Sequence, residues 1–295
     1  SKGAGLAVPA FRVKTAPKPP GLRSGPMPEI PTVPLTGPIL NSAYIGDLPV
    51  TLASHEAILG EIARVIASGE KGRHVAITNT ETLYHTMHVP DYARFIRDSS
   101  FSLCDGVGVI VAGWAWGADI SRFNGPVFQL KASEYGVGRG WRHFYYGGKE
   151  GVAEKMAERL QAQFPGMIVC GSYCPPFRKL SAAEEEDVIA RINATRPDFV
   201  WVSLGMPQKE LWIQRHLGRI DAAFMCGVGG AFDFHAGAIP WAPAPLRFLG
   251  LEWLYRLIVE PKLRAKRLWW SVIGMTHYLR RGVARFMFLR SRQKT

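Results

Sequence analysis

The sequence predicts an α/β protein with a mostly parallel, Rossmann-like sheet that has helices on both faces. Short apolar runs alternate with amphipathic helix patterns, and several of the runs end in glycine. A continuous apolar run is typical of a parallel strand buried on both faces, and a terminal glycine permits a sharp turn or the close approach of a ligand. The predicted strands are residues 74–79, 101–106, 143–148, 167–173, 199–205 and 222–229.

Helix patterns fill the intervals between these strands. A helix that starts near Ser54 places Ile58 and Ile62 on one face, and Ser181 with Glu184 makes the capping box of another. Further helix patterns lie at residues 152–160 and 207–217. In doubly wound sheets ligands bind at the carboxyl ends of the strands, so the glycine-ended strand tips mark the expected site.

Composition divides the chain into three parts. Nine of the 21 prolines fall in the first 40 residues, so we expect residues 1–38 to be a flexible tail, which lacks the apolar core of a signal peptide. Residues 39–260 hold the α/β domain. Residues 261–295 carry ten basic and no acidic residues, whereas the rest of the chain has 26 basic and 24 acidic ones. This distribution indicates a local anionic partner, either phospholipid or nucleic acid.

We interpret the C-terminal part as a basic amphipathic segment that associates with a membrane surface. Aromatic residues such as Trp269, Trp270 and Phe286 stand among arginines, which is typical of an interfacial element. The longest apolar stretch, residues 268–279, is too short to span a bilayer. Nucleic-acid binding by the same basic tail is the alternative. The four cysteines lack zinc-site spacing and are expected to be reduced thiols.

Polar side chains follow two of the predicted strands, and each has a structural and a functional interpretation. Thr78 and Asn79 end the first strand, where they either cap a helix or contact a ligand. Asp105 ends the next strand and precedes two nearby glycines. It either caps a tight turn or acts as a general base from a partly apolar pocket.

Two further turns have the same double interpretation. Gly147, Gly148 and Lys149 offer backbone N–H groups and a positive charge to a phosphate, or they form a plain turn with a surface lysine. Gln208 follows Gly205 at the first turn of a helix. It either bonds a sugar hydroxyl or a uracil edge, or it begins a surface helix.

Two longer motifs lie near the end of the α/β domain. They read GVGGAFDFHAG at residues 227–237 and GLEWLYRLIVEP at residues 250–261. Within the second motif, Glu252 and Arg256 are four residues apart, which is the spacing of an ion pair along a helix. Neither motif alone identifies a function, but the order of all these segments along the chain is more specific than any one of them.

In that order, the chain from about residue 48 to residue 270 resembles the WecG/TagA/CpsF glycosyltransferase family. The resemblance implies an inverting, metal-independent enzyme without a cofactor. Its donor would be a UDP-sugar, and its acceptor a sugar on polyprenyl diphosphate, in the synthesis of bacterial exopolysaccharide or another cell-envelope polysaccharide. It also implies a cytoplasmic protein held peripherally on the inner face of the membrane. Homo-oligomers are possible partners, and no nucleic-acid partner is expected.

The resemblance also implies roles for particular residues. Asp105 maps to the general base, and Arg122 maps to an arginine able to neutralise the leaving diphosphate. Arg256 and Arg264 are candidates to reach the same diphosphate. The other implied substrate-binding residues are Thr78, Asn79, Gly147, Gly148, Lys149, Gly205, Gln208, Glu210, Gly229, Phe232 and Asp233.

The chain departs from the family pattern at several positions. Ile77 stands where a threonine is expected, Lys209 where a glutamine is usual, and Trp241 where an arginine precedes Ala-Pro. We expect these changes to affect donor or acceptor preference and not the reaction class. A nicotinamide-dependent oxidoreductase is disfavoured, because no G-x-G-x-x-G turn follows the first predicted strand.

Overall fold

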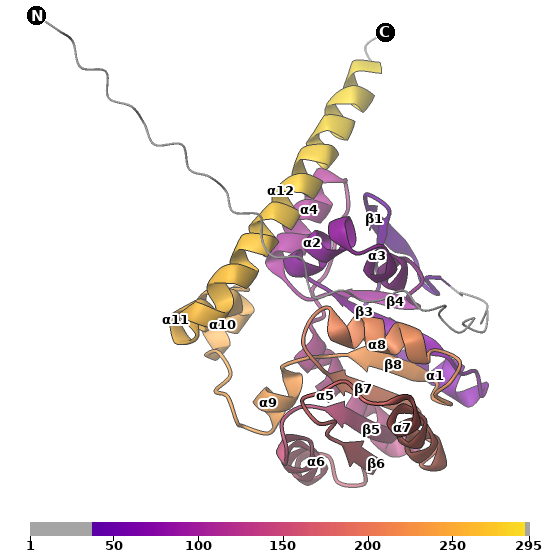
Figure 1. Ribbon diagram of the computed structural model, residues 1–295. Coiled ribbons are helices and arrows are strands. Elements are labelled where there is room, and N and C mark those ends of the chain that lie inside the picture. Colours follow the sequence, from indigo (N-terminus) through magenta and orange to yellow (C-terminus); the bar gives the residue numbers. More distant parts are fainter. Residues whose placement is uncertain (1–36, 293–295) are drawn as a thin grey trace, which may run out of the picture. The chain divides into compact units, whose positions relative to one another are not determined.

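The computed structural model describes residues 37–292, without the side chains of Phe248, Leu263 and Arg292. The tail predicted over residues 1–38 therefore lies almost wholly outside the described residues. All the described residues belong to one compact unit. Figure 1 shows the described part as a sheet flanked by helices, with one long helix at its C-terminal end.

A six-stranded sheet forms the centre, in the order β4-β3-β8-β7-β5-β6, and every neighbouring pair is parallel. The strands are β3 (Arg73–Thr78), β4 (Phe101–Cys104), β5 (Arg142–Gly147), β6 (Ile168–Tyr173), β7 (Phe199–Ser203) and β8 (Phe224–Gly227). All six predicted strands are present, with ends that differ by at most two residues. The predicted parallel α/β fold is confirmed.

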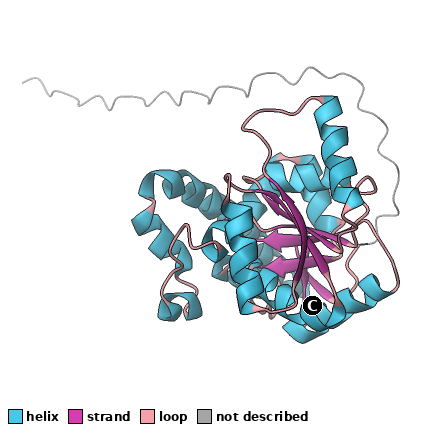
Figure 2. Cartoon of the chain, turned by 90° about the horizontal axis from the view of Figure 1, so that it is seen from below, coloured by secondary structure: helices cyan, strands magenta, loops and turns pink. Residues whose placement is uncertain are grey.

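Helices cover both faces of this sheet (Figure 2). They are α1 (His55–Ala67), α2 (Thr80–His88), α3 (Pro90–Arg97), α4 (Val107–Ala115), α5 (Gly125–Gly136), α6 (Val152–Gln163), α7 (Ala182–Ala194), α8 (Gln208–His216), α9 (Ala231–His235), α10 (Ala244–Phe248), α11 (Glu252–Val259) and α12 (Pro261–Arg292). Ser54 caps α1 by accepting a hydrogen bond from the Ala57 N–H, and Ser181 with Glu184 forms the predicted capping box of α7.

Two apolar cores lie on opposite faces of the sheet. Successive residues of a strand point to opposite faces, so Val75 joins one core and Ala76 joins the other. Residues of α3, α7 and α8 fill the Ala76 core, whereas residues of α1, α5 and α6 fill the Val75 core. The apolar strand runs seen in the sequence are therefore buried on both sides, as a parallel sheet requires.

A two-stranded antiparallel hairpin, β1 (Ser42–Ile45) and β2 (Leu48–Thr51), precedes the sheet and was not predicted. Its strands have four residues each, which is too short for a clear alternation of apolar and polar positions. The Thr51 hydroxyl accepts a hydrogen bond of 3.0 Å from the Ser102 N–H, so the hairpin lies beside the edge strand β4.

As far as Gly282, α12 packs closely against α2 and α4 (Figure 1). A Cβ atom added at Gly274 would lie 2.6 Å from the Tyr84 nitrogen, and one at Gly282 would lie 2.8 Å from the Ala115 carbonyl oxygen. The intervening Tyr278 is 4% exposed. Beyond Gly282, in contrast, apolar side chains such as Phe286 are exposed. Among the described residues, no helix is long and apolar enough to cross a membrane.

Candidate active site

The carboxyl ends of three neighbouring strands bring predicted site residues together. Asn79 follows β3, Asp105 follows β4 and Gly229 lies just after β8, and these strands are adjacent in the sheet. The Asp105 N–H donates a hydrogen bond of 2.8 Å to the Thr78 carbonyl, which continues the β3–β4 ladder to the tip. The candidate base and Asn79 therefore lie at the same edge of the sheet, where ligands of this architecture bind.

The carboxylate of Asp105 is half-buried and has no fixed partner within residues 37–292. Its side chain makes no hydrogen bond or ion pair there, although the guanidinium of Arg256 is close enough to interact with its charge. A carboxylate at a strand tip that the protein itself leaves unpaired is available to accept a proton from a ligand hydroxyl.

Arg122 joins three separate parts of the site. Its Nε donates to the Asp105 carbonyl at 3.1 Å, its Nη1 donates to the Arg247 carbonyl at 2.8 Å, and its Nη2 lies 3.4 Å from Glu252. These contacts connect the end of β4 with α10 and α11. Because the three guanidinium nitrogens already bond to protein, Arg122 holds the site together, and its contact with a diphosphate stays a prediction.

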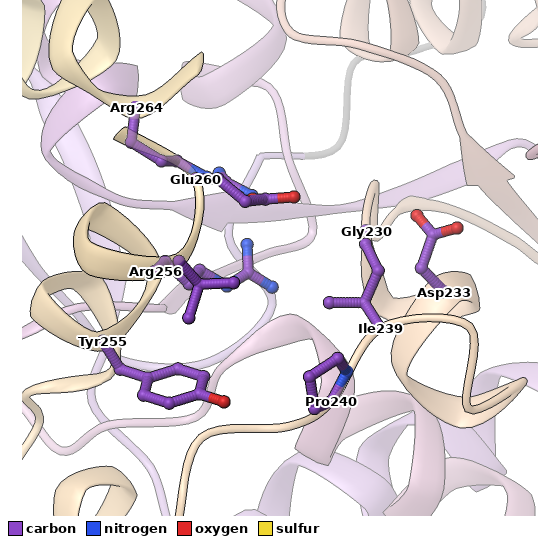
Figure 3. Close-up of a pocket in the computed structure, with 9 residues that line it drawn as sticks. Gly230, Asp233, Ile239, Pro240, Tyr255, Arg256, Glu260 and Arg264 are labelled. Atoms are coloured by element: carbon purple, nitrogen blue, oxygen red, sulfur yellow. The ribbon is translucent and has the colours of Figure 1, made fainter. Parts of the chain in front are cut away.

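Arg256 projects from α11 into a small cavity that faces α9 (Figure 3). Its Nε lies 3.6 Å from Glu252, and its guanidinium lies 4.1 Å from the centre of the Phe234 ring. Burial, and next the charge of Arg264, lower the pKa of Arg256. The cavity has a volume of about 40 Å³, and its lining is Gly230, Asp233, Ile239, Pro240, Tyr255, Arg256, Val259, Glu260 and Arg264.

Asp233 lies on α9, on the other side of this cavity from Arg256 (Figure 3). Burial raises the pKa of Asp233, while the charges of Lys149 and Arg256 act in the opposite direction. Lys149 therefore lies near the same cavity, which places the Gly-Gly-Lys turn beside the FDF motif. Arg264 also lines the cavity and is bonded to Glu260 at 2.9 Å. Arg256 and Arg264 thus line a space between α9 and α11, and the charge of Lys149 acts on Asp233 in its wall.

The glycines of the predicted turns have packing roles in the structure. Gly147 has a φ of +96°, and a Cβ atom there would lie 2.4 Å from the Ser203 carbonyl oxygen. The Gly148 N–H donates to that same carbonyl at 2.8 Å. The Ser203 hydroxyl donates in turn to the Gly229 carbonyl at 2.7 Å. These contacts hold the ends of β5, β7 and β8 together, which is the structural interpretation of the turns.

Of the two candidates at the start of α8, Gln208 and Glu210, one is exposed and one is buried. Gln208 is exposed, and with its amide nitrogen turned inward it donates to the Gly205 carbonyl at 3.0 Å. Lys209 and Glu210 form an ion pair and are 5% and 3% exposed. Lys209, which replaces the usual glutamine, therefore lies inside the protein, and neither member of the pair faces solvent.

Two other predicted substrate-binding side chains are enclosed by protein. Thr78 is fully buried, and its hydroxyl lies 2.8 Å from the Ser102 hydroxyl. Phe232 is also fully buried, with its ring edge-to-face against Tyr145. Both support the strand ends from within, and neither side chain is open to a ligand in this arrangement.

Some residues of the site were not identified from the sequence. Tyr255 and Glu260 line the cavity, and Glu252 contacts both Arg122 and Arg256. The spacing of Glu252 and Arg256 predicted their ion pair, but the contact with Arg122 spans 130 residues and leaves no local pattern. Within residues 37–292, no three His, Cys, Asp or Glu side chains gather in a way that could hold a metal ion.

Comparison with known proteins identifies the family. The glycosyl transferase WecG/TagA/CpsF family matches residues 43–291, which include the whole sheet and nearly all of α12. The chain belongs to this family. It is therefore a glycosyltransferase, and the resemblance noted in the strand-tip motifs is confirmed.

Relatives in three bacteria carry the name N-acetylglucosaminyldiphosphoundecaprenol N-acetyl-beta-D-mannosaminyltransferase. The Bacillus subtilis protein is 30% identical over 234 residues, which is 75% of this glycosyltransferase and 85% of the relative. The Bacillus spizizenii protein is 30% identical over 192 residues, 65% of this chain and 73% of the relative. The Staphylococcus aureus protein is 27% identical over 189 residues, 64% and 72% of the two chains.

Proposed function

We propose that this glycosyltransferase moves an N-acetylhexosamine from a UDP-sugar to a sugar carried on polyprenyl diphosphate, with inversion at the transferred carbon and without a metal ion. The names of the relatives support this acceptor class and this class of transferred sugar. The reaction belongs to the synthesis of a bacterial cell-envelope polysaccharide.

The unpaired carboxylate of Asp105 is the observation that carries the mechanism. Asp105 takes the proton of the acceptor hydroxyl as that oxygen attacks the anomeric carbon from the face opposite the nucleotide. The bond from the anomeric carbon to the diphosphate oxygen breaks, and UDP leaves with the electron pair. One base is sufficient for this single displacement, whereas glycoside hydrolysis uses two carboxylates.

Cations around the cavity account for the departure of UDP. Arg256, Arg264 and Lys149 lie at or near the cavity, and Arg256 also acts on the charge of Asp105. Fixed guanidinium groups stabilise the charge that develops on a leaving diphosphate, as a bound metal ion does in other transferases. Asn79, at the neighbouring strand tip, supplies an amide to the donor sugar.

The test is product analysis with purified protein. UDP-N-acetylhexosamines are incubated with a short-chain polyprenyl-diphosphate N-acetylglucosamine, with and without EDTA. We expect a disaccharide with a β-linkage, formed at the same rate in EDTA. An α-linked product would reject inversion, loss of product in EDTA would reject the metal-free mechanism, and no product from any UDP-sugar would reject the proposed reaction.

We also propose that α11 and α12 place the enzyme on an anionic membrane surface. Exposed apolar side chains lie on both helices, among them Trp253, Ile258, Trp269, Phe286 and Met287. The basic residues of the C-terminal part stand beside them, and each is expected to contribute about 1 kcal/mol near an anionic surface. An acceptor with a polyprenyl chain is itself held in a membrane, so this placement brings the enzyme to its substrate.

Vesicle flotation tests this placement. The wild-type protein should float with phosphatidylglycerol vesicles, and the double variant Phe286→Ser with Met287→Ser should float several-fold less. Phe177→Ser is the matched control, because Phe177 is 97% exposed on a loop far along the chain from α12. Equal flotation of the wild type and the double variant would reject the role of the outer half of α12. Tight filter binding of DNA without flotation would favour the nucleic-acid alternative.

A further inference from the structure

A buried chain of polar side chains runs from the start of α8 to the tip of β3. Lys209 forms an ion pair with the Glu210 Oε1, and the Tyr92 hydroxyl lies 3.3 Å from that same oxygen. The Tyr92 hydroxyl is also 3.3 Å from the Thr82 Oγ1, which accepts a hydrogen bond of 3.1 Å from the Asn79 N–H. The chain thus joins a buried ion pair to a residue of the active-site edge.

Every member of this chain except Asn79 is at most 5% exposed. A buried ion pair is poor evidence for stability, because removing two charges from water costs about as much as their attraction returns. The Glu210 Oε2 is also buried and has no hydrogen-bond partner within residues 37–292. An ion pair with an unsatisfied oxygen does little for folding, so its geometry points to positioning.

Asn79 uses one end of its side chain for this connection. Its Oδ1 accepts from the Thr82 N–H at 3.0 Å and lies 3.3 Å from the Thr82 hydroxyl oxygen. The carbonyl end of the amide is thereby anchored to the first turn of α2. An asparagine amide has one acceptor and two N–H donors, so the end that remains for a ligand is the donor end.

Tyr92 links the two halves of the chain. Its hydroxyl has one proton and two acceptors at equal distance, Glu210 and Thr82. Burial, and next the charge of Glu210, raise the pKa of Tyr92 well above its ordinary value, so it stays a donor at every physiological pH. The Lys209 stem also packs beneath Gly227, where an added Cβ atom would lie 3.1 Å away. The ion pair therefore contacts the tip of β8 as well.

We propose that the Lys209–Glu210 pair, acting through the hydroxyls of Tyr92 and Thr82, is a positioning device that fixes the Asn79 amide with its N–H groups toward the sugar donor. Asn79 touches the ligand, and the other four residues act through it. The identity of that ligand rests on the proposed function, whereas the orientation of the amide does not.

Kinetics of hydroxyl-deletion variants give the first test. Tyr92→Phe and Thr82→Val each remove one hydroxyl, keep the side-chain volume and leave the ion pair intact. Each should raise KM for the UDP-sugar by about 3- to 10-fold and change kcat by less than about twofold. Thr82→Ser, which keeps the hydroxyl, should restore the wild-type KM. The double variant should be no worse than the single ones, because both break one connected chain.

Spectroscopy without substrate gives the second test. In ¹⁵N–¹H spectra of the full chain, the side-chain amide signals of Asn79 should shift in Tyr92→Phe. The side-chain amide signals of Asn124 should not shift, because Asn124 caps α5 through its own bond to Val127 and makes no contact with Tyr92 or Thr82. If no UDP-sugar is turned over, this measurement still decides the positioning. An unmoved Asn79 signal, a wild-type KM in both variants, or losses that simply add would overturn the proposal.

Discussion

Two sets of carboxylates surround the strand ends, and they differ in whether the protein already occupies them. Glu81, Glu210 and Glu252 each contact a cationic side chain, at Arg267, Lys209 and Arg122 respectively. Asp105 and Asp233 make no side-chain hydrogen bond or ion pair with any residue of the described range. The first set is held by cationic side chains of the protein, whereas the second set is left free to meet a ligand. Pairing with a cationic side chain, and not closeness to the strand ends alone, distinguishes carboxylates held by the protein from carboxylates available to a ligand.

The sharpest way to break this comparison is Asp105→Asn. The amide cannot take a proton, so kcat should fall by about 10³-fold, within the range measured for loss of a general base. Because the carboxylate has no protein partner, the free energy of unfolding should change by less than about 0.5 kcal/mol. Steady-state kinetics at saturating substrates and urea unfolding measure the two effects.

Asp119→Asn is the control, since Asp119 is exposed in the loop after α4. It should leave both kcat and stability unchanged. Turnover by Asp105→Asn within tenfold of the wild type would remove Asp105 from the role of base, and a large loss of stability would show that its carboxylate is structural after all.

The opposite result is expected for Glu81→Gln. Glu81 is 5% exposed on α2, and Arg267 of α12 donates to it at 2.7 Å. Loss of this charge should lower the free energy of unfolding by about 1–3 kcal/mol, because Arg267 then loses its partner at the α2–α12 contact. Activity at saturating substrate should fall less than for Asp105→Asn.

The pH dependence gives this prediction a sign. Burial raises the pKa of Glu81, but the contact with His85 at 3.7 Å and the hydrogen bond from Arg267 outweigh it, and the net pKa lies below its ordinary value of 4.5. A lowered carboxyl pKa gives stability that is present above the unfolded-state pKa and is lost as the pH falls through the folded-state pKa. The free energy of unfolding of the wild type should therefore fall below about pH 4.5 more steeply than that of Glu81→Gln. Parallel curves would contradict the assignment.

The strand tips show which features of the site can be predicted from the sequence alone. Alternation of apolar runs and helix patterns predicts all six sheet strands, and the motifs at their ends place Asp105 and Asn79 correctly at one edge. Local patterns cannot show which polar side chain turns inward. Thr78, Phe232 and Glu210 share those motifs yet are buried, because the periodicity of a short strand end or first helical turn does not distinguish a core-facing from a cavity-facing position.

Long-range contacts cannot be predicted from a single sequence for a second reason. Glu252 reaches Arg122 across 130 residues, and Tyr92 reaches Glu210 across 118. Such pairs depend on the order of strands in the sheet, which places α3 beside α8 and α11 beside the end of β4. The helix spacing of Glu252 and Arg256, in contrast, is visible in the sequence because both residues lie within one turn.

The second unpaired carboxylate, Asp233, should show the smallest effect of the three. It faces Arg256 across the cavity and is separated from Asp105 by its place on α9. Asp233→Asn should lower kcat/KM by about 3- to 10-fold, because an amide still donates and accepts in the cavity but no longer balances Lys149 and Arg256. Initial rates measured at increasing UDP-sugar concentration would show whether the loss falls on KM, as expected for a binding group.

Stability separates Asp233 from the paired acids. Burial raises the pKa of Asp233, and a raised carboxyl pKa means that the folded state holds its proton longer than the unfolded state. Stability is then lost as the pH rises from the unfolded-state pKa through the folded-state pKa. Asp233→Asn removes that loss, so the variant should be at least as stable as the wild type at pH 7, whereas Glu81→Gln is less stable. A destabilised Asp233→Asn would mean that this carboxylate, too, is held by the protein, and Asp105 would then be the one acid of the five left for chemistry.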